Sequence, residues 1–459
     1  MAKVTHRKIL WPALVLLLST CAPPLAQPNT KIAINAYLPS ATTLAGTGSV
    51  PDQWWQIFNN NSLDALVNQG LQASPTLAQA NANLAAAQAN GAAATGAYLP
   101  QIGLNPNVTR AAYPAGPNAS APYTIYSLTG SISYDPGLFG ARHYAFKNAQ
   151  AEIAYNQAEL DAARQTLAGN ITAAFINEAG YQAQIAATKQ TIAEEQSLLT
   201  LLNGEYADGA IPKLNILQQQ AQILAMQSSL YPLQTNADIA QVQLAVLTGQ
   251  PPAQFQNAPL NLDTIAIPSQ IPVTLPSAYL ANRPDLQAAR ALVAAQNATL
   301  GIAVAHLYPD LTLSADGGYA AETLNTLFQP SAGLWTLAGN LLQPLYDGGV
   351  LHARKRAAQA ELAAALAAYH GAVLSAFGEA ADTLKALQND QAALARAQDA
   401  SQTAAQAYQL ARQQFALGAV DYTTVLTAQI TAGQQALSLV QTRTTLLLDI
   451  ARLQSAMAQ

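Results

Sequence analysis

The five histidines are the side chains most capable of acid–base or metal chemistry, yet their spacing does not favour a catalytic site. They are His6, His143, His306, His352 and His370. No two are spaced as in the HExxH helix of a zinc enzyme, and no GxSxG turn is present to expose a serine nucleophile. Asp347-Gly348-Gly349 lacks the Lys-Ser/Thr pair of a phosphate-binding loop, so it predicts a turn that caps a helix. The sequence therefore predicts a protein that is not an enzyme and holds no metal or other cofactor.

The single cysteine, Cys21, offers a different chemistry, because it stands at the end of an export signal. A basic start precedes an apolar stretch, residues 9–18, which is too short to span a bilayer. The following Leu18-Ser19-Thr20-Cys21 resembles the processing box of bacterial lipoproteins, in which the cysteine becomes the lipidated first residue of the mature chain. Thr20 departs from the usual Gly, Ala or Ser, and the alternative is an ordinary secretory signal. We predict a signal peptide over residues 1–20 and lipid attachment at Cys21.

The composition limits the partners and the membrane elements available to the chain. A net charge of −5 and only 10% charged residues argue against nucleic acid, which requires a basic surface. Much of the 51% hydrophobic content is alanine, which favours closely packed helices. Beyond the signal, Gln, Asn, Asp and Arg interrupt the alanine-rich tracts, so we expect no helix apolar enough to cross a membrane. Any membrane crossing is therefore expected to use strands.

The chain matches itself at one fixed spacing. Pro75 and Pro284 are 209 positions apart, and the same spacing separates Gly209 from Gly418. This period is far longer than that of solenoid repeats, so it predicts a tandem duplication of a whole multi-element unit. We assign residues 62–248 to the first repeat and residues 283–459 to the second. The N-terminal segment 21–61 precedes the repeats, and the proline-rich segment 249–282 links them.

Each repeat contains two stretches in which apolar and polar residues alternate with a period of two. The alternation covers about residues 101–136 and about residues 310–345, and loops at 111–122 and 319–333 divide each region into two strands. Strands of about ten residues are long enough to cross the hydrocarbon layer. The apolar residues expected to form an outward-facing band are Tyr126, Leu128, Ile132, Tyr134, Trp335, Leu337 and Leu341.

Four strands cannot close a barrel, and unpaired strand edges cannot remain in lipid. Several copies of the chain must therefore share one barrel. Two copies would give eight strands with an interior filled by side chains, and three would give twelve strands with room for a lumen. The pattern alone permits either number. A soluble alternative has the strand hairpins lying on a helical domain.

A long helix is predicted after each strand pair, at about residues 142–208 and about residues 351–417. At a rise of 1.5 Å per residue, each would reach roughly 100 Å. Each is expected to end at a glycine-containing turn and to return as a helix of about 35 residues, at 213–247 and 422–457. The result is two helical hairpins, about 141–248 and about 349–457, whose tips lie far from the strands.

Four further stretches stand in a fixed order along the chain: Trp54-Trp55-Gln56-Ile57-Phe58, Asn282-Arg283-Pro284-Asp285-Leu286, His306-Leu307-Tyr308-Pro309-Asp310-Leu311 and Gln343-Pro344-Leu345-Tyr346-Asp347-Gly348-Gly349. Together they resemble the TolC-type outer-membrane efflux factors, in particular their NodT-like lipoprotein branch. Their order, combined with the 209-residue spacing, carries the resemblance over residues 21–459.

The resemblance implies a membrane α+β fold. In it, a trimeric, twelve-stranded outer-membrane β-barrel with four strands per chain is continuous with a long α-helical barrel of coiled-coil hairpins. Segments 21–61 and 249–282 would contribute to an equatorial belt. The implied location is the outer membrane of a Gram-negative bacterium, with a lipid anchor and an extension into the periplasm. The implied partners are a periplasmic membrane-fusion (adaptor) protein and an inner-membrane pump, most simply of the proton-driven RND class. The implied function is a passive exit duct for small toxic compounds or drugs.

The resemblance also points to a gate at the helical tips, where relatives often carry a ring of aspartates. Here the corresponding positions are Asn215 and Thr427, with Thr424 one turn earlier, while Asp421 and Asp208 remain nearby. Because rings of carboxylates favour cations, we expect weaker cation selectivity at this gate than in acid-bearing relatives. The alternative role of Thr424 and Thr427 is packing on the helix surface.

The small apolar residues of the two turns are candidates for docking the adaptor. They are Gly209, Ala210, Ile211, Gly418, Ala419 and Val420. Their alternative role is turn geometry alone, because glycine fits the position that follows a helix.

Two other functions remain open from the sequence. One is an outer-membrane duct for protein export with an ATP-driven transporter, which the lipoprotein-like signal disfavours. The other is a non-channel, periplasmic coiled-coil structural lipoprotein, which would need no outward-facing apolar strand band. Metal efflux is disfavoured because one cysteine and three methionines supply no relay for copper or silver.

Overall fold

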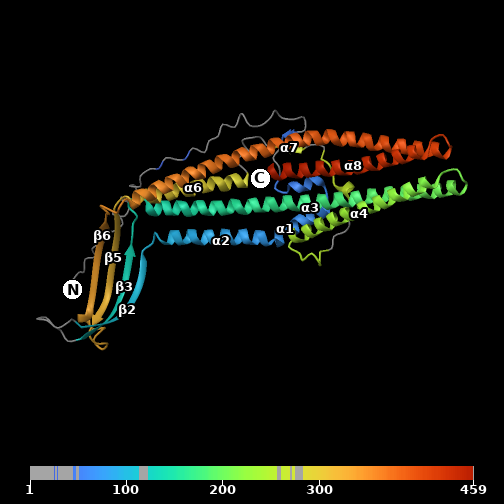
Figure 1. Ribbon diagram of the computed structural model, residues 1–459. Helices are drawn as coiled ribbons and strands as arrows, with labels where there is room; N and C mark the ends of the chain where they lie inside the picture. The colour runs from blue at the N-terminus through green and yellow to red at the C-terminus, as the bar shows by residue number, and fades with distance from the viewer. Residues whose placement is uncertain are drawn as a thin grey trace, which may run out of the picture. The chain divides into compact units, whose positions relative to one another are not determined.

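The computed structural model describes residues 25, 28, 45–47, 51–112, 122–255, 260–268, 271–273 and 283–457 (Figure 1). The predicted signal peptide, residues 1–20, and the predicted lipid site Cys21 lie outside these residues. The chain divides into two compact units. The strand unit contains the described residues of 82–157 and 288–371, and the hairpin unit contains those of 32–81, 158–287 and 372–459. Each unit thus combines parts of both predicted repeats.

The strand unit is built on one antiparallel sheet with the strand order β2-β3-β5-β6. The strands are β2 (Gln101–Ala111), β3 (Tyr123–Tyr134), β5 (Asp310–Ala321) and β6 (Gly333–Leu342). The prediction of four strands in two hairpins is confirmed. β3 pairs with β5 and so joins the two hairpins, which leaves β2 and β6 as the edges of this sheet.

The second strand hairpin turns later than the sequence predicts. The expected loop at 319–333 begins inside β5, because Tyr319 still pairs with Leu128 on one side and Gly333 on the other. The run Tyr319-Ala320-Ala321 contains neither glycine nor proline to stop the strand. The connection that remains includes the short 3-10 helix η4 (Pro330–Ala332).

The strand register gives the sheet one apolar and one polar face, because directly paired residues of antiparallel strands lie on the same face. One row across the four strands is Ile102–Ile132–Ala315–Leu337, and the adjacent row on the opposite face is Gly103–Ser131–Asp316–Thr336. All seven residues predicted for the outward band lie on the apolar face. Many of its large side chains are exposed in the single chain, with 79% for Ile102 and 81% for Trp335.

The apolar face has the height of a membrane-spanning band. From Leu311 to Ala321, β5 extends ~34 Å at a rise of about 3.4 Å per residue. A strand tilt of roughly 40° reduces this to ~26 Å, close to the apolar band of about 25 Å in outer-membrane barrels.

Four helices form two helical hairpins. They are α3 (Ala141–Ala207), α4 (Lys213–Leu247), α7 (Val350–Ala416) and α8 (Tyr422–Met457). The first turns of α3 and α7 belong to the strand unit and their remainder to the hairpin unit. Both helices contain 67 residues, and their bounds differ by 209 positions. The same spacing relates α2 (Pro75–Gly96) to α6 (Pro284–Ala305), so the sequence period reappears in the elements.

The segments that flank the first repeat contribute structure that the sequence did not predict. β1 (Ala45–Thr47) pairs in parallel with β4 (Ile271–Val273), which lies inside the expected linker. The 3-10 helices η2 (Trp54–Phe58) and η3 (Leu262–Thr264) lie in the same unit, together with α1 (Asn61–Ala73), the helix with which the first repeat begins. Trp54, Phe58, Ile265 and Ile271 are fully buried, so these segments supply part of the hydrophobic core.

We expected no helix after the signal to be apolar enough to cross a membrane, and by length and composition this expectation is wrong. Pro284–Ala305 and Val350–Ala416 each contain a window that passes this test. Alanine accounts for much of that hydropathy, as the sequences of both helices contain many alanines. Length and composition alone are weak evidence for a span, and most residues in both windows are not buried within the chain.

Candidate functional site

The two hairpin tips are built by the same turn. Gly209 and Gly418 adopt φ values of +74° and +70°, in the left-handed region. The N–H of Ala210 donates to the carbonyl of Glu205 at 2.8 Å, and the N–H of Ala419 donates to the carbonyl of Gln414 at 2.9 Å. These bonds close a Schellman motif at each helix end. No atom lies within 4 Å of a Cβ placed on either glycine, so backbone conformation rather than space requires glycine.

The six predicted docking residues divide into exposed and anchored positions. Gly209, Ala210, Gly418 and Ala419 are exposed. Ile211 and Val420 are partly buried against a hydrophobic cluster that we call the tip cluster. Its buried members come from all four hairpin helices and are Leu198, Leu202, Ile216, Tyr408, Ala411, Tyr422 and Val425. Packing in this cluster holds the two tips together within one chain.

The predicted gate residues are only partly brought together. The Asp421 carboxylate accepts hydrogen bonds from the Thr424 N–H at 3.0 Å and from the Thr424 hydroxyl at 2.7 Å. These bonds, together with that from the Thr423 hydroxyl, hold the pKa of Asp421 below its usual range. The Thr427 hydroxyl instead donates to the carbonyl of Thr423, and Asn215 lies on α4. Asp421 therefore acts locally as the N-cap of α8.

The Asp347-Gly348-Gly349 turn is a helix cap, as the sequence predicts. The Asp347 carboxylate accepts the N–H groups of Leu351 at 2.7 Å and Gly349 at 2.8 Å. These backbone hydrogen bonds, that of Leu351 first, lower the pKa of Asp347. The residue thus fixes the start of α7 rather than binding a phosphate.

A buried polar network lies beside the tip cluster, and the sequence did not predict it. The Tyr422 hydroxyl donates to the Gln219 side-chain oxygen at 2.9 Å, and the Gln219 side-chain NH₂ donates to the backbone carbonyl of Glu195 at 3.2 Å. Glu195 is 1% exposed, and burial raises the pKa of its carboxyl to about 7, against a smaller lowering by a hydrogen bond with Gln222. Among the described residues, Glu195 Oε2, both Gln429 amide atoms and the Tyr408 hydroxyl have no hydrogen-bond partner. The network is therefore incompletely paired.

The helices α3 and α8 meet along a close contact that we call the seam. A Cβ placed on Gly169 would lie 2.9 Å from Ser455 Oγ, and one on Gly180 would lie 2.7 Å from the Thr444 side chain. Nearer the tip, a Cβ on Gly433 would lie 3.2 Å from Thr191. On each helix these positions are 11 residues apart, and the two numbers of every pair add up to 624. The seam thus has one antiparallel register in which each contact pairs glycine with serine or threonine.

The same register continues into the tip and the polar network. Leu198 belongs to the tip cluster and Leu426 packs against it, and their residue numbers also add up to 624. So do Glu195 and Gln429, both 1% exposed. The regular 11-residue spacing of Gly169 and Gly180 was the sequence signal that could have revealed the seam, but its partner helix is known only from the fold.

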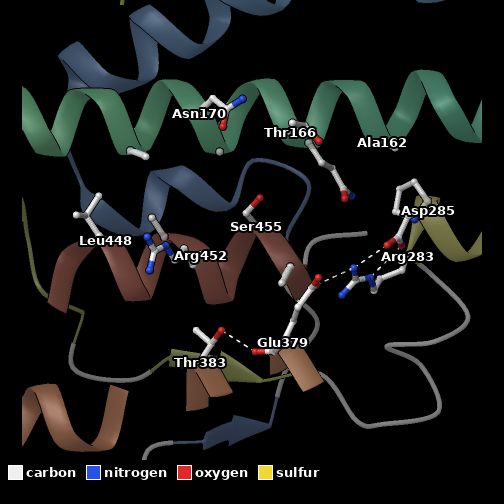
Figure 2. A pocket seen from close by; sticks show the side chains of 16 residues that line it. Ala162, Thr166, Asn170, Arg283, Asp285, Glu379, Thr383, Leu448, Arg452 and Ser455 are labelled. Atoms are coloured by element: carbon white, nitrogen blue, oxygen red, sulfur yellow. Dashed lines mark hydrogen bonds and ion pairs between the residues drawn. The ribbon is translucent and has the colours of Figure 1, made fainter. Parts of the chain in front are cut away.

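A cavity of about 570 Å³ lies at the end of the seam away from the tips (Figure 2). α3, α7, α8 and the start of α6 line it, and Gly169 and Ser455 are among its residues. Arg283 binds Asp285 at 2.6 Å and Glu379 at 3.1 Å, while Arg452 binds Asp449 at 3.1 Å. These pairs compensate the arginine charges. The arrangement ties α6 to α7 and does not resemble an acid–base or nucleophilic centre.

Comparison with known proteins reveals a family for most of the chain. The family model described as "Outer membrane efflux protein" matches residues 66–250 and again residues 275–459. The chain is similar to the pyoverdine export outer membrane protein OpmQ of Pseudomonas putida, with 28% identity over 84% of this chain and 84% of that protein. It is 24% identical to nodulation protein T of Rhizobium leguminosarum bv. trifolii over 73% of this chain and 72% of that protein. The solved outer-membrane channel OprN has the same fold, with a TM-score of 0.89, 24% identity, and coverage of 95% of this chain and 98% of that chain.

Proposed function

Because the chain belongs to the Outer membrane efflux protein family and is an outer-membrane efflux duct of the NodT/TolC type, we propose that it works as a homotrimer with one shared barrel. A channel of this kind is not an enzyme. The proposal goes beyond family membership in the number of copies, the partners, the cargo and the residues at the tips.

The open edges of the sheet are the main observation that supports the proposed trimer. β2 and β6 each have one unpaired side in the described chain, and the face they border is apolar and exposed. Open strand edges are not tolerated in lipid, so β2 of one copy must pair with β6 of another. Three copies contribute twelve strands and leave a lumen lined by the polar face, whereas two copies give a barrel filled by side chains.

The matching spacing of the elements supports a tandem duplication as the origin of this chain. Helices α3 and α7, and helices α2 and α6, each repeat at 209 positions. In a trimer, the two hairpins of each chain would then give six nearly equivalent hairpins around one axis. Residues 62–248 and 283–459 are the proposed repeats.

The tips are the proposed contact with the other members of an efflux system. Gly209, Ala210, Gly418 and Ala419 are exposed and small, so a periplasmic adaptor protein can approach the backbone closely there. The adaptor would connect the duct to an inner-membrane pump of the RND class. Asn215, Asp421, Thr424 and Thr427 form the proposed gate, and the scarcity of carboxylates there would weaken its preference for cations.

Lipid attachment at Cys21 is proposed from the sequence alone. The residue lies outside the described part of the chain. Metabolic labelling with palmitate checks it, because a chain carrying Cys21→Ala must lose the label if this is the modified residue.

The proposed cargo is small and organic, since one relative is named for the export of pyoverdine. Protein export is the second candidate. Deleting the gene separates the two candidates when both drug susceptibility and the set of secreted proteins are measured. If the cargo is small, the deletion should change drug susceptibility and leave the secreted proteins unchanged.

Single-particle electron microscopy of the detergent-extracted protein tests the assembly. We expect a three-fold particle with a strand barrel at one end and twelve helices in projection through the hairpins. A two-fold particle, or a particle without a barrel, would reject the proposal.

A further inference from the structure

We infer that Asp316 forms a ring of carboxylates inside the shared barrel and that this ring gives the outer end of the duct a preference for cations over anions. The inference rests on the proposed trimer and deepens it by naming a residue that selects among charged solutes. It starts from the polar face of the sheet β2-β3-β5-β6, which would line the lumen (Figure 1).

The strand register assigns Asp316 to the polar face near the middle of β5. Asp316 pairs directly with Ser131 of β3 and with Thr336 of β6, and Ser131 pairs with Gly103 of β2. Residues that pair directly in antiparallel strands lie on the same face. The other members of this row are glycine, serine and threonine, so the Asp316 carboxylate is the one charged group in the row.

No basic group compensates this carboxylate within the described chain. The Asp316 side chain is partly exposed and forms no hydrogen bond or ion pair with a described residue. Among the described strand residues of the polar face, the other charged residue is Asp310, and none is lysine or arginine. Arg110 of β2 lies on the opposite face, in the series that begins with Ile102. The face that would line the lumen therefore carries only negative charge on these strands.

The internal spacing of 209 positions relates Asp316 to Asn107. β5 begins 209 positions after β2, and Asn107 lies on the polar face of β2, where it pairs with Ser127. Asparagine has nearly the shape of aspartate but no charge. In a trimer with two repeats in each chain, six equivalent positions around the lumen would carry aspartate and asparagine alternately. The two repeats thus show that the strand accepts either residue at this position.

The lumen is narrow enough for three carboxylates to act on its whole cross-section. Twelve strands about 4.8 Å apart and tilted by roughly 40° enclose a barrel ~24 Å across between backbones. The carboxylates extend inward from this wall, so they lie about 10 Å from the axis, a distance close to the Debye length at 0.1 M salt. Three charges at this distance should raise the ratio of cations to anions on the axis about fivefold at 0.1 M salt and hardly change it at 1 M salt.

Reversal potentials of the full-length protein in planar bilayers test the inference. Asp316→Asn removes the ring, and Asn107→Asp doubles the number of carboxylates at the equivalent positions. The matched control combines both changes and so moves the three carboxylates from the second repeat to the first. Each variant uses a residue that the other repeat already carries at this position. The potentials are measured under salt gradients centred on about 0.1 M and about 1 M.

The expected results follow from the number of carboxylates in the ring. At about 0.1 M salt, the permeability ratio of cations to anions should fall at least about twofold in Asp316→Asn and rise at least about twofold in Asn107→Asp. The combined variant should recover the ratio of the wild type. At about 1 M salt the four proteins should agree, because screening removes the effect. A purely structural role of Asp316 predicts neither this recovery nor this dependence on salt.

The outcomes separate the inference from the proposed function on which it rests. Equal ratios in all four proteins at low salt, or differences that persist at high salt, would overturn the ring. Native mass measurement of the same samples shows whether the trimer is intact in that case. A wild type that is not a trimer would overturn both. If Asp316→Asn fails to assemble, Asn107→Asp still decides, since it must raise the ratio.

Discussion

Burial of the Glu195 carboxyl predicts that the hairpin tips become less stable as the pH rises. The pKa of this group is about 7 in the closed tip and returns toward its ordinary value of 4.5 when the tip opens. Below pH 4.5 the carboxyl is protonated in both states, so it has no effect on the balance. Between 4.5 and about 7 only the opened tip releases the proton, and this favours opening. Above about 7 both states are ionised and the effect is complete.

The magnitude follows from the two pKa values. The full shift corresponds to at most about 3 kcal/mol. Between pH 6 and pH 8, the opening equilibrium changes by about tenfold. Glu195→Gln keeps the shape of the side chain and cannot ionise, so its tip should open equally at both pH values. The variant should therefore match the wild type near pH 4 and be more stable at pH 8.

Hydrogen–deuterium exchange of the backbone amides near the tips measures this directly. Comparing wild type with Glu195→Gln at the same pH cancels the chemical dependence of exchange on pH. Glu178→Gln is the matched control, because Glu178 is also buried with a pKa of about 7 but lies on α3 beside the Gly180 contact of the seam. Its replacement should leave the pH dependence of the tip peptides unchanged.

The other groups around Glu195 limit the possible explanations of a positive result. Tyr408 on α7 and Tyr422 on α8 have raised pKa values and remain neutral between pH 6 and 8. Gln219 and Gln222 on α4 do not titrate. If Glu195→Gln exchanges with the same tenfold pH dependence as the wild type, the buried carboxyl is not the cause and the reasoning fails.

Five further substitutions test the seam, the network, the gate and the docking surface. Gly180→Leu should destabilise the protein by about 1–3 kcal/mol through overpacking, whereas Gly371→Ala, which meets no neighbour, should gain about 0.5–1 kcal/mol; thermal unfolding measures both. Tyr422→Phe leaves a buried amide oxygen unpaired and should cost about 1–3 kcal/mol, seen as faster amide exchange in the first turns of α8. Thr427→Asp should raise the cation preference in planar bilayers, and an unchanged reversal potential would reject the gate. Ala210→Arg should abolish export with the trimer intact, and loss of the trimer would instead favour a purely structural turn.

The sequence predicts elements well where the signal is local. The period of two located the four strands, and glycine after each long helix located both tips, with bounds of the helices within about one residue. The error at Tyr319 arose because loop composition extended back into a strand whose pairing is fixed by β3 and β6.

Features that depend on distant pairing were not predictable in this way. The parallel pair β1–β4 joins three-residue strands that carry no period of their own. The buried position of Glu195 depends on four helices meeting at the tip, so a single helix gives no sign of it. In the proposed gate, Asp421 and Thr424 are three residues apart in the sequence, but their hydrogen bonds appear only with the cap geometry.

The alternation of glycine across the seam has a consequence for natural variation in this family. Glycine lies on α3 at positions 169 and 180, but on α8 at position 433. A larger residue at one side of such a pair can be accepted only when the opposite residue shrinks, so substitutions at positions 180 and 444 should be inherited together. Lineages in which the large and the small residue of a seam pair have changed sides should show few sequences with only one of the two changes. Such a sequence would have either two large residues, which overpack the seam, or two small ones, which leave a cavity. Aligned descendants should therefore show paired size reversals along this line and independent drift at the exposed positions beside it.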